Sequence, residues 1–318
     1  MNGPRLAGPG DVAVLFPGQG SQRVGMGTWL FREVPEMHEI LGVLSDAAGC
    51  DIGDLCARGP LSRLSDTRFT QPAVFAVGMA AYRYLARLDA PIGAFAGHSV
   101  GEITAVCATQ ALTPHQAAAL VCDRGRLMAA APGQGRMALV TGLEHRTVQR
   151  CCADAAAAGR VVIAAHNSPI EYVISGDEAA VARCCEVAER IGARRVVRLK
   201  ASHAFHSPLM DPVAGQWQRL LGRQSIGQPA APVILNVTGE ATTDPHHLRW
   251  GLHRQLTRSV EWWNTMRTLC RLGFRTVIAC ETDGYLTRIA RSAGLRAVSF
   301  AEPRRVRDLL DRGRVAAL

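Results

Sequence analysis

A segment with the sequence Gly-His-Ser-Val-Gly, at residues 97–101, restricts the fold of this chain more than any other feature. It follows an apolar run at 92–96 that predicts a strand, and it precedes an amphipathic run that predicts a helix. Ser99 therefore lies at the apex of a sharp strand-to-helix turn, where glycines on both sides permit the tight backbone. The pentapeptide alone fits two interpretations: a catalytic nucleophile beside the free N–H groups of a helix, or a turn with a chance serine.

The rest of the chain alternates predicted strands and helices, which is typical of an α/β fold with a mainly parallel sheet. In the larger part we expect buried strands at 12–16, 92–96, 232–236 and 275–279. We expect helices at 70–88, from 101, from 113 to about 131, from 208, at 259–272 and at 284–293. A capping box with proline in the first turn predicts the start of the helix at Thr113.

The segment at 134–201 has a different pattern. Its expected order is strand, helix, strand, strand, helix, strand, which is the order of a ferredoxin-like unit. We therefore predict a small inserted domain at 134–201, with a hydrolase-like large α/β domain formed by residues 1–133 and 202–318.

Composition excludes several classes of protein. The chain has 318 residues, 48% of them hydrophobic, and it has no apolar run long enough to cross a membrane. Its first ten residues lack the apolar core of a secretion signal. The ten cysteines form no Cys-x-x-Cys pair, which favours a reduced, cytoplasmic protein without a metal site.

The net charge of +9 raises the question of nucleic-acid binding. The arginines are spread along the chain, only 5% of residues are aromatic, and no nucleic-acid motif is present. The charge therefore indicates an acidic protein partner rather than nucleic acid.

A serine hydroxyl is a weak nucleophile and needs a base. Of the ten histidines, His98 is adjacent to Ser99, but its side chain leaves the turn in another direction. His203 and His206 follow the small domain at a crossing between domains, where sites are common. Five others lie on stretches typical of the surface: His115, His145, His246, His247 and His253.

A second glycine-rich turn, at 17–22, follows the first strand. Its spacing does not match the dinucleotide-binding pattern, because residue 23 is arginine where that pattern has glycine. We therefore expect no dinucleotide cofactor. The turn can instead present the backbone N–H of Gln19 to an oxyanion.

Five motifs together resemble the malonyl-CoA:acyl carrier protein transacylases and the acyltransferase domains of polyketide synthases. The likeness extends from about residue 11 to 300. It is carried by Phe-Pro-Gly-Gln-Gly-Ser-Gln at 16–22, Gln-Pro-Ala at 71–73, Gly-His-Ser-Val-Gly-Glu at 97–102, Arg-Gly-Arg-Leu-Met at 124–128 and His-Ala-Phe-His at 203–206. Five motifs in this order are far more specific than a lone serine elbow.

The resemblance implies a role for each matching residue. Ser99 would be acylated, and His206 would act as its base and then as its acid. The backbone N–H groups of Gln19 and Val100 would form the oxyanion hole. Arg124 would bind the free carboxylate of the acyl group, for which its planar guanidinium is suited.

The same resemblance implies which residues contact the acyl group. Gln71 would brace the site, although a polar residue near a helix start is nearly as good an interpretation. Phe205 would crowd the α-carbon of the acyl group. In this family, His-Ala-Phe-His at this place is associated with malonyl, and Tyr-Ala-Ser-His with methylmalonyl. We also place His98 among the substrate-binding residues.

Two stretches depart from the family pattern. Residues 281–286 read Glu-Thr-Asp-Gly-Tyr-Leu where a Gly-Pro-Gly turn is usual, and 258–262 lack the usual proline. In the family, backbone carbonyls near this place orient the catalytic histidine. The sequence therefore leaves open which group orients His206.

The implied reaction is two-step transfer of malonyl from CoA to the phosphopantetheine thiol of an acyl carrier protein. It requires no metal or redox cofactor, and it implies neither nucleic-acid nor membrane binding. Alternatives within enzymes are transfer of another acyl group between carrier proteins and hydrolysis of an acyl thioester. A non-catalytic scaffold and, more distantly, a nucleic-acid binder are the alternatives outside enzymes.

Overall fold

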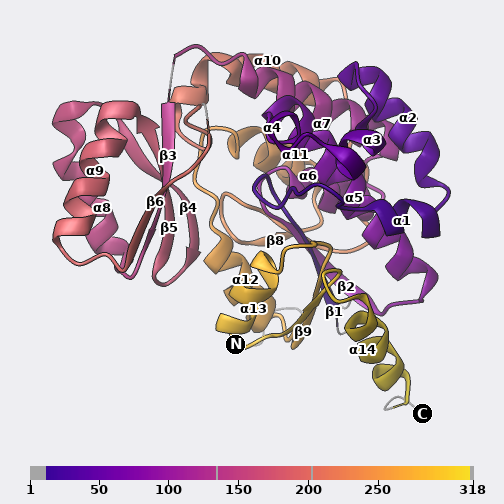
Figure 1. Ribbon diagram of the computed structural model, residues 1–318. Helices are drawn as coiled ribbons and strands as arrows, with labels where there is room; N and C mark the ends of the chain where they lie inside the picture. Colours follow the sequence, from indigo (N-terminus) through magenta and orange to yellow (C-terminus); the bar gives the residue numbers. More distant parts are fainter. Residues whose placement is uncertain (1–11, 134, 202, 316–318) are drawn as a thin grey trace.

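The computed structural model describes residues 12–133, 135–201 and 203–315, and its larger part is built around a six-stranded sheet (Figure 1). The strand order is β10-β9-β1-β2-β7-β8; neighbours pair in parallel except β7 and β8, which are antiparallel. The strands are β1 (Val12–Phe16), β2 (Ile92–Gly97), β7 (Val233–Ile234), β8 (Ala241–Thr242), β9 (Thr276–Ala279) and β10 (Arg296–Ser299).

Helices cover both faces of this sheet, because alternate residues of its central strand are buried on opposite sides. Val14 and Phe16 belong to one apolar core, whereas Ala13 and Leu15 belong to another. Ten helices contribute to or flank the first core: α1 (Thr28–Glu33), α2 (Met37–Ala48), α3 (Ile52–Arg58), α4 (Leu61–Leu64), α5 (Thr67–Arg87), α6 (Gly101–Ala108), α7 (Pro114–Ala129), α10 (Asp211–Gly222), α11 (Pro245–Arg254) and α14 (Pro303–Val315). The second core is closed by α12 (Trp262–Arg271) and α13 (Tyr285–Ser292).

A second sheet of four antiparallel strands lies beside the first and has the order β4-β5-β3-β6. Two helices cover its outer face in Figure 1 and share a third apolar core with it. These elements are β3 (Gly135–Thr141), α8 (His145–Asp154), the 3₁₀ turn η1 (Ala156–Ala158), β4 (Val161–Ser168), β5 (Glu171–Asp177), α9 (Glu178–Arg190) and β6 (Arg195–Arg198). The predicted fold class, including the ferredoxin-like order, is confirmed.

Two backbone hydrogen bonds join the small sheet to a segment of the large part that precedes α12. The N–H of Val260 donates to the carbonyl of Ala164 at 2.9 Å, and the N–H of His166 donates to the carbonyl of Val260 at 2.9 Å. A segment of the large part thus adds one rung to β4. The proposed boundaries at 134 and 201 stay predictions, since Gln134 and Ser202 lie outside the described residues.

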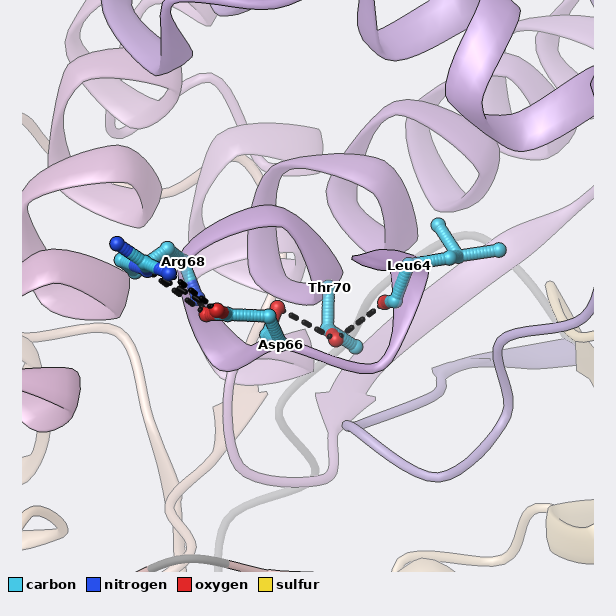
Figure 2. A network of polar contacts seen from close by, with 4 residues as sticks. All are labelled: Leu64, Asp66, Arg68 and Thr70. Atoms are coloured by element: carbon cyan, nitrogen blue, oxygen red, sulfur yellow. Dashed lines mark hydrogen bonds and ion pairs between the residues drawn. The ribbon is translucent and has the colours of Figure 1, made fainter. Parts of the chain in front are cut away.

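The helix expected at 70–88 begins three residues earlier, at Thr67, because local contacts cap it there (Figure 2). Asp66 accepts a hydrogen bond from the N–H of Arg68 at 3.0 Å. The hydroxyl of Thr70 donates to the carbonyl of Leu64 at 2.6 Å and to that of Asp66 at 3.0 Å. These contacts fix the first turn of α5, which carries part of the site described below.

The capping box at Thr113 is confirmed: Thr113 Oγ1 accepts from the N–H of Gln116, and the side chain of Gln116 accepts from the N–H of Thr113. The helix expected from 208 opens as a 3₁₀ turn, η2 (Pro208–Met210), before α10. Sequence analysis did not predict α1 to α4, β8, α11, β10 or α14.

Candidate active site

The turn between β2 and α6 has the strained backbone that the sequence predicts. Ser99 has a φ of 55°, in the left-handed region that residues other than glycine rarely adopt. A side chain at residue 97 would place its Cβ 1.9 Å from the backbone of Gly101, and one at residue 101 would meet the carbonyl of Phe16 at 2.5 Å. Gly97 is therefore needed for the tightness of the turn itself, and Gly101 for its close packing against the end of β1.

His206 lies against Ser99, as predicted. The Nε2 atom of His206 is 2.7 Å from Ser99 Oγ, and its Nδ1 atom is 2.6 Å from the backbone carbonyl of Gln255. Because a carbonyl only accepts hydrogen bonds, Nδ1 carries the proton and Nε2 is free to take one from the serine. Gln255 is thus the orienting group that the sequence left open.

The imidazole is held in its neutral form. Burial, and next the positive charge of Arg124, lower the pKa of His206 to about 3, against the hydrogen bond to Gln255. A neutral imidazole is the state that a general base needs before the reaction.

Arg124 lies on the buried face of α7, only 1% exposed, as the functional interpretation requires. Its guanidinium donates to the side-chain oxygens of Gln71 at 2.8 Å and of Gln255 at 2.7 Å. A third contact, to Ser99 Oγ, is 3.3 Å. Burial lowers the pKa of Arg124 to about 10, which leaves it charged at neutral pH, and Glu102 offsets part of this shift.

One donor of this guanidinium has no protein acceptor. Within the part of the chain that the structure describes, Nε of Arg124 is buried without a hydrogen-bond partner. A buried, charged donor without an acceptor is costly. An incoming anion beside Ser99 would remove that cost.

A chain of side-chain hydrogen bonds connects Arg124 to the loop after β1. Gln71 Nε2 donates to Thr67 Oγ1 at 2.9 Å, and the Thr67 hydroxyl donates to Gln19 Oε1 at 2.8 Å. A Cβ at residue 18 would lie 2.7 Å from the carbonyl of His98, so this loop packs directly on the nucleophile turn. Gln19 is therefore close to the turn that contains Ser99 and Val100. The oxyanion role of the N–H groups of Gln19 and Val100 stays a prediction.

Phe205 and His98 lie on the periphery of this cluster. Phe205 is 6% exposed and stacks on His203 with ring centroids 6.0 Å apart, so His203, the other candidate base, is directed elsewhere. His98 Nε2 is 3.1 Å from Asn167 Oδ1 on β4, and burial lowers the pKa of His98 to about 4. His98 thus connects the turn to the small sheet.

A cavity of about 910 Å³ lies beside the site. Its walls include Gln19, Thr67 and Phe205, each adjacent to a residue of the buried cluster. Basic side chains gather at this cavity: Arg68, Arg126 and Lys200.

Sequence reasoning missed two residues of the site and assigned no role to a third. Asn236 accepts from the N–H of Ser99 at 2.7 Å and donates to the carbonyl of Gly97 at 2.6 Å. Gln255 contacts His206 and Arg124, and Glu102 accepts from Gln255 Nε2. The position of Asn236 at the end of the strand predicted at 232–236 was a usable signal, because sites form at the carboxyl ends of parallel strands.

Among the described residues, no group of three or more His, Cys, Asp and Glu side chains could hold a metal ion. Nor does the described part contain a helix sufficiently long and apolar to pass through a bilayer.

A serine elbow with a buried imidazole on an α/β sheet is typical of enzymes that form acyl-serine intermediates. The sequence pattern of the family described as "Acyl transferase domain" matches residues 14–299. The chain belongs to this family.

The chain is 37% identical over 280 residues to the polyketide biosynthesis protein ThaF of Burkholderia thailandensis, covering 88% of this chain and 24% of ThaF. It is 37% identical over 268 residues to the malonyl CoA-acyl carrier protein transacylase of Haemophilus influenzae, covering 82% and 85%. The crystal structure of the malonyl-CoA:acyl carrier protein transacylase of Xanthomonas oryzae superposes with a TM-score of 0.90 at 35% identity, covering 95% of this chain and 98% of that one.

Proposed function

We propose that this protein transfers a malonyl group from CoA to the phosphopantetheine thiol of an acyl carrier protein, through an ester on Ser99. The observation that carries the proposal is one buried cluster in which Ser99 Oγ lies 2.7 Å from His206 Nε2 and 3.3 Å from a guanidinium nitrogen of Arg124. A nucleophile, its base and a carboxylate-binding group thus lie within reach of one small acyl group. The relatives from H. influenzae and X. oryzae carry the names of malonyl transacylases.

In the loading step, His206 Nε2 takes the Ser99 proton while Oγ attacks the thioester carbonyl. The C–O bond forms, and the carbonyl electrons become an oxyanion that the N–H groups of Gln19 and Val100 would stabilise. One such donor contributes about 3 kcal/mol at the transition state. The C–S bond then breaks, and CoA leaves as a thiol with the proton from His206.

In the transfer step the same groups act in reverse. His206 takes the proton of the carrier thiol, the sulfur attacks the malonyl ester, and Ser99 leaves with the proton returned to its oxygen. All proton transfers use this one imidazole, and the proposal includes no metal or redox cofactor. The proposal places the enzyme in the cytoplasm. The ten cysteines are all free thiols, which fits a reducing compartment.

Arg124 supports malonyl over a neutral acyl group. The free carboxylate would meet the guanidinium donors at the inner end of the site, including Nε, which otherwise has no acceptor in the described residues. Phe205, directly before the base in sequence, would restrict branching at the α-carbon. The basic residues at the cavity mouth suit an acidic carrier protein and the phosphates of CoA.

The test is intact-protein mass spectrometry after mixing with malonyl-, methylmalonyl- and acetyl-CoA, each with and without a carrier protein. We expect a malonyl adduct that maps to Ser99 and is discharged by the carrier thiol. Arg124→Ala should lose malonyl loading and keep or gain acetyl loading. Rapid discharge by water without carrier would identify a hydrolase instead, and no adduct with any acyl-CoA would overturn the proposal.

A further inference from the structure

A second carboxyl group is buried beneath the site and has no part in the reaction described above. Glu102 lies in the first turn of α6, three residues after the nucleophile, and is 0% exposed. Its Oε1 accepts from the backbone N–H of Asn236 at 3.1 Å, and its Oε2 accepts from the side chain of Gln255. Burial raises the pKa of Glu102, while the hydrogen bonds from Asn236 and Gln255 and the positive charge of Arg124 lower it. Because each oxygen faces an N–H donor, the surroundings of the group suit the ionised form.

The side-chain amide of Gln255 lies between two charged groups of opposite kind. Its oxygen accepts from the Arg124 guanidinium at 2.7 Å, and its nitrogen donates to Glu102. A guanidinium only donates and a carboxylate only accepts, so the two together permit one orientation of the amide. The same residue's backbone carbonyl orients His206 at 2.6 Å. The carboxylate thereby fixes the amide that faces the acyl-binding cation, whereas the base is oriented by the backbone of the same residue.

The other carboxylate oxygen acts on the nucleophile turn. It accepts the N–H of Asn236, whose side chain accepts from the N–H of Ser99 at 2.7 Å and donates to the carbonyl of Gly97 at 2.6 Å. These bonds hold the backbone of a serine whose φ is 55°. One carboxylate therefore contacts the residues that support the nucleophile turn and the guanidinium.

We propose that Glu102 is a positioning residue that sets the acyl preference of the site, because it fixes the Gln255 amide and thereby the direction of the Arg124 guanidinium. The inference rests on the proposed malonyl transfer and extends it to a residue that touches neither acyl group nor thiol.

The decisive variant is Glu102→Gln. Its amide nitrogen would face a donor on whichever side it lies, either the N–H of Asn236 or the side-chain NH₂ of Gln255. Relief by rotation of the Gln255 amide would turn its NH₂ toward Arg124, which also only donates. We expect kcat/KM for malonyl loading to fall about 10- to 100-fold, as for loss of a hydrogen bond to a charged group, and acetyl loading to fall far less.

Two matched variants separate positioning from general destabilisation. Glu281→Gln makes the same change at another buried carboxyl, 1% exposed, that caps α13, and it should leave the malonyl-to-acetyl ratio unchanged. Glu102→Asp keeps the charge and should recover part of the ratio. If Glu102→Gln does not fold, Gln255→Leu should reproduce the loss of preference, because Glu102 acts through that amide.

The preference is also tested in the Arg124→Ala background. There Glu102→Gln should change the malonyl-to-acetyl ratio no further, since the group it positions is gone. Equal loss of both acyl groups in Glu102→Gln and Gln255→Leu, or an unchanged ratio with full activity, would overturn the inference. Absence of any malonyl adduct on the unaltered protein would instead refute the proposed function itself.

Discussion

Two turns at the carboxyl ends of strands flanking β1 perform the same connection in different ways. The turn after β2 leads into α6, and the turn after β9 leads into α13; each includes a buried glutamate. Glu281 accepts from its own helix: from Leu286 N at 2.7 Å, Thr287 N at 2.8 Å and Thr287 Oγ1 at 2.7 Å. Glu102 instead accepts from residues 134 and 153 positions away in the sequence.

The two turns differ in which contacts fix their geometry. The turn after β9 satisfies the free N–H groups of its helix locally, so it stabilises a helix start without help from the rest of the chain. The nucleophile turn is instead held by Asn236 and Gln255 from distant segments. Its geometry therefore depends on the complete tertiary structure, and the predictions below separate the two cases.

The largest expected effect is Ser99→Ala. It removes the nucleophile, and related serine enzymes lose on the order of 10⁶ in kcat on such a change. The thermal unfolding midpoint should change little, because Ser99 Oγ caps no helix and the backbone N–H of residue 99 keeps its bond to Asn236. Acyl-adduct formation and calorimetry check this, and a remaining malonyl adduct would place the nucleophile elsewhere.

Asn236→Ala comes next. It removes the acceptor of the Ser99 N–H and the donor to Gly97, so the strained turn loses its long-range support. We expect kcat for loading to fall about 10- to 100-fold, from hydrogen-bond losses of about 1–3 kcal/mol. Stopped-flow measurement of CoA release checks it; a rate within twofold of the unaltered protein would show that the turn holds itself.

The pH dependence gives a smaller effect with a definite sign. The pKa of His206 is lowered to about 3, so the neutral base persists on acidification and is lost only as the pH falls toward that value. Loading at pH 5 should stay within about twofold of that at pH 7, whereas an ordinary histidine would be only about 3% neutral. A titration of kcat/KM with a midpoint near 6.5 would contradict the burial argument.

The last expected effect is on stability, at the other turn. Burial raises the pKa of Glu281 to about 7 from its usual 4.5, so its favourable contribution is present below 4.5 and is lost as the pH rises through about 7. Glu281→Gln should remove that dependence, about 3 kcal/mol in the free energy of unfolding between pH 4.5 and 7. Urea denaturation at several pH values measures it, and parallel curves for both proteins would contradict it.

The sequence predicted those parts of the fold and site that local patterns encode. Ser99, His206 and Arg124 lie in motifs, and the structure brings them together. Asn236 and Gln255 were missed, because their importance comes only from contacts with segments 49 to 156 positions away. Among the elements missed, β8 has two residues and α4 has four, too short for any periodicity to appear.

The hydrogen bonds between Val260 and β4 have a consequence for engineering by segment exchange. After a graft of the contiguous stretch 134–201 alone, the backbone of Val260 would have to pair with a strand from another protein in place of Ala164 and His166. Asn167, the next residue of that strand, contacts His98 of the large part, and this contact would also have to form across the two parent sequences. Exchange that carries residues 258–262 along with the stretch should therefore give working chimeras more often than exchange at the apparent ends of the insert.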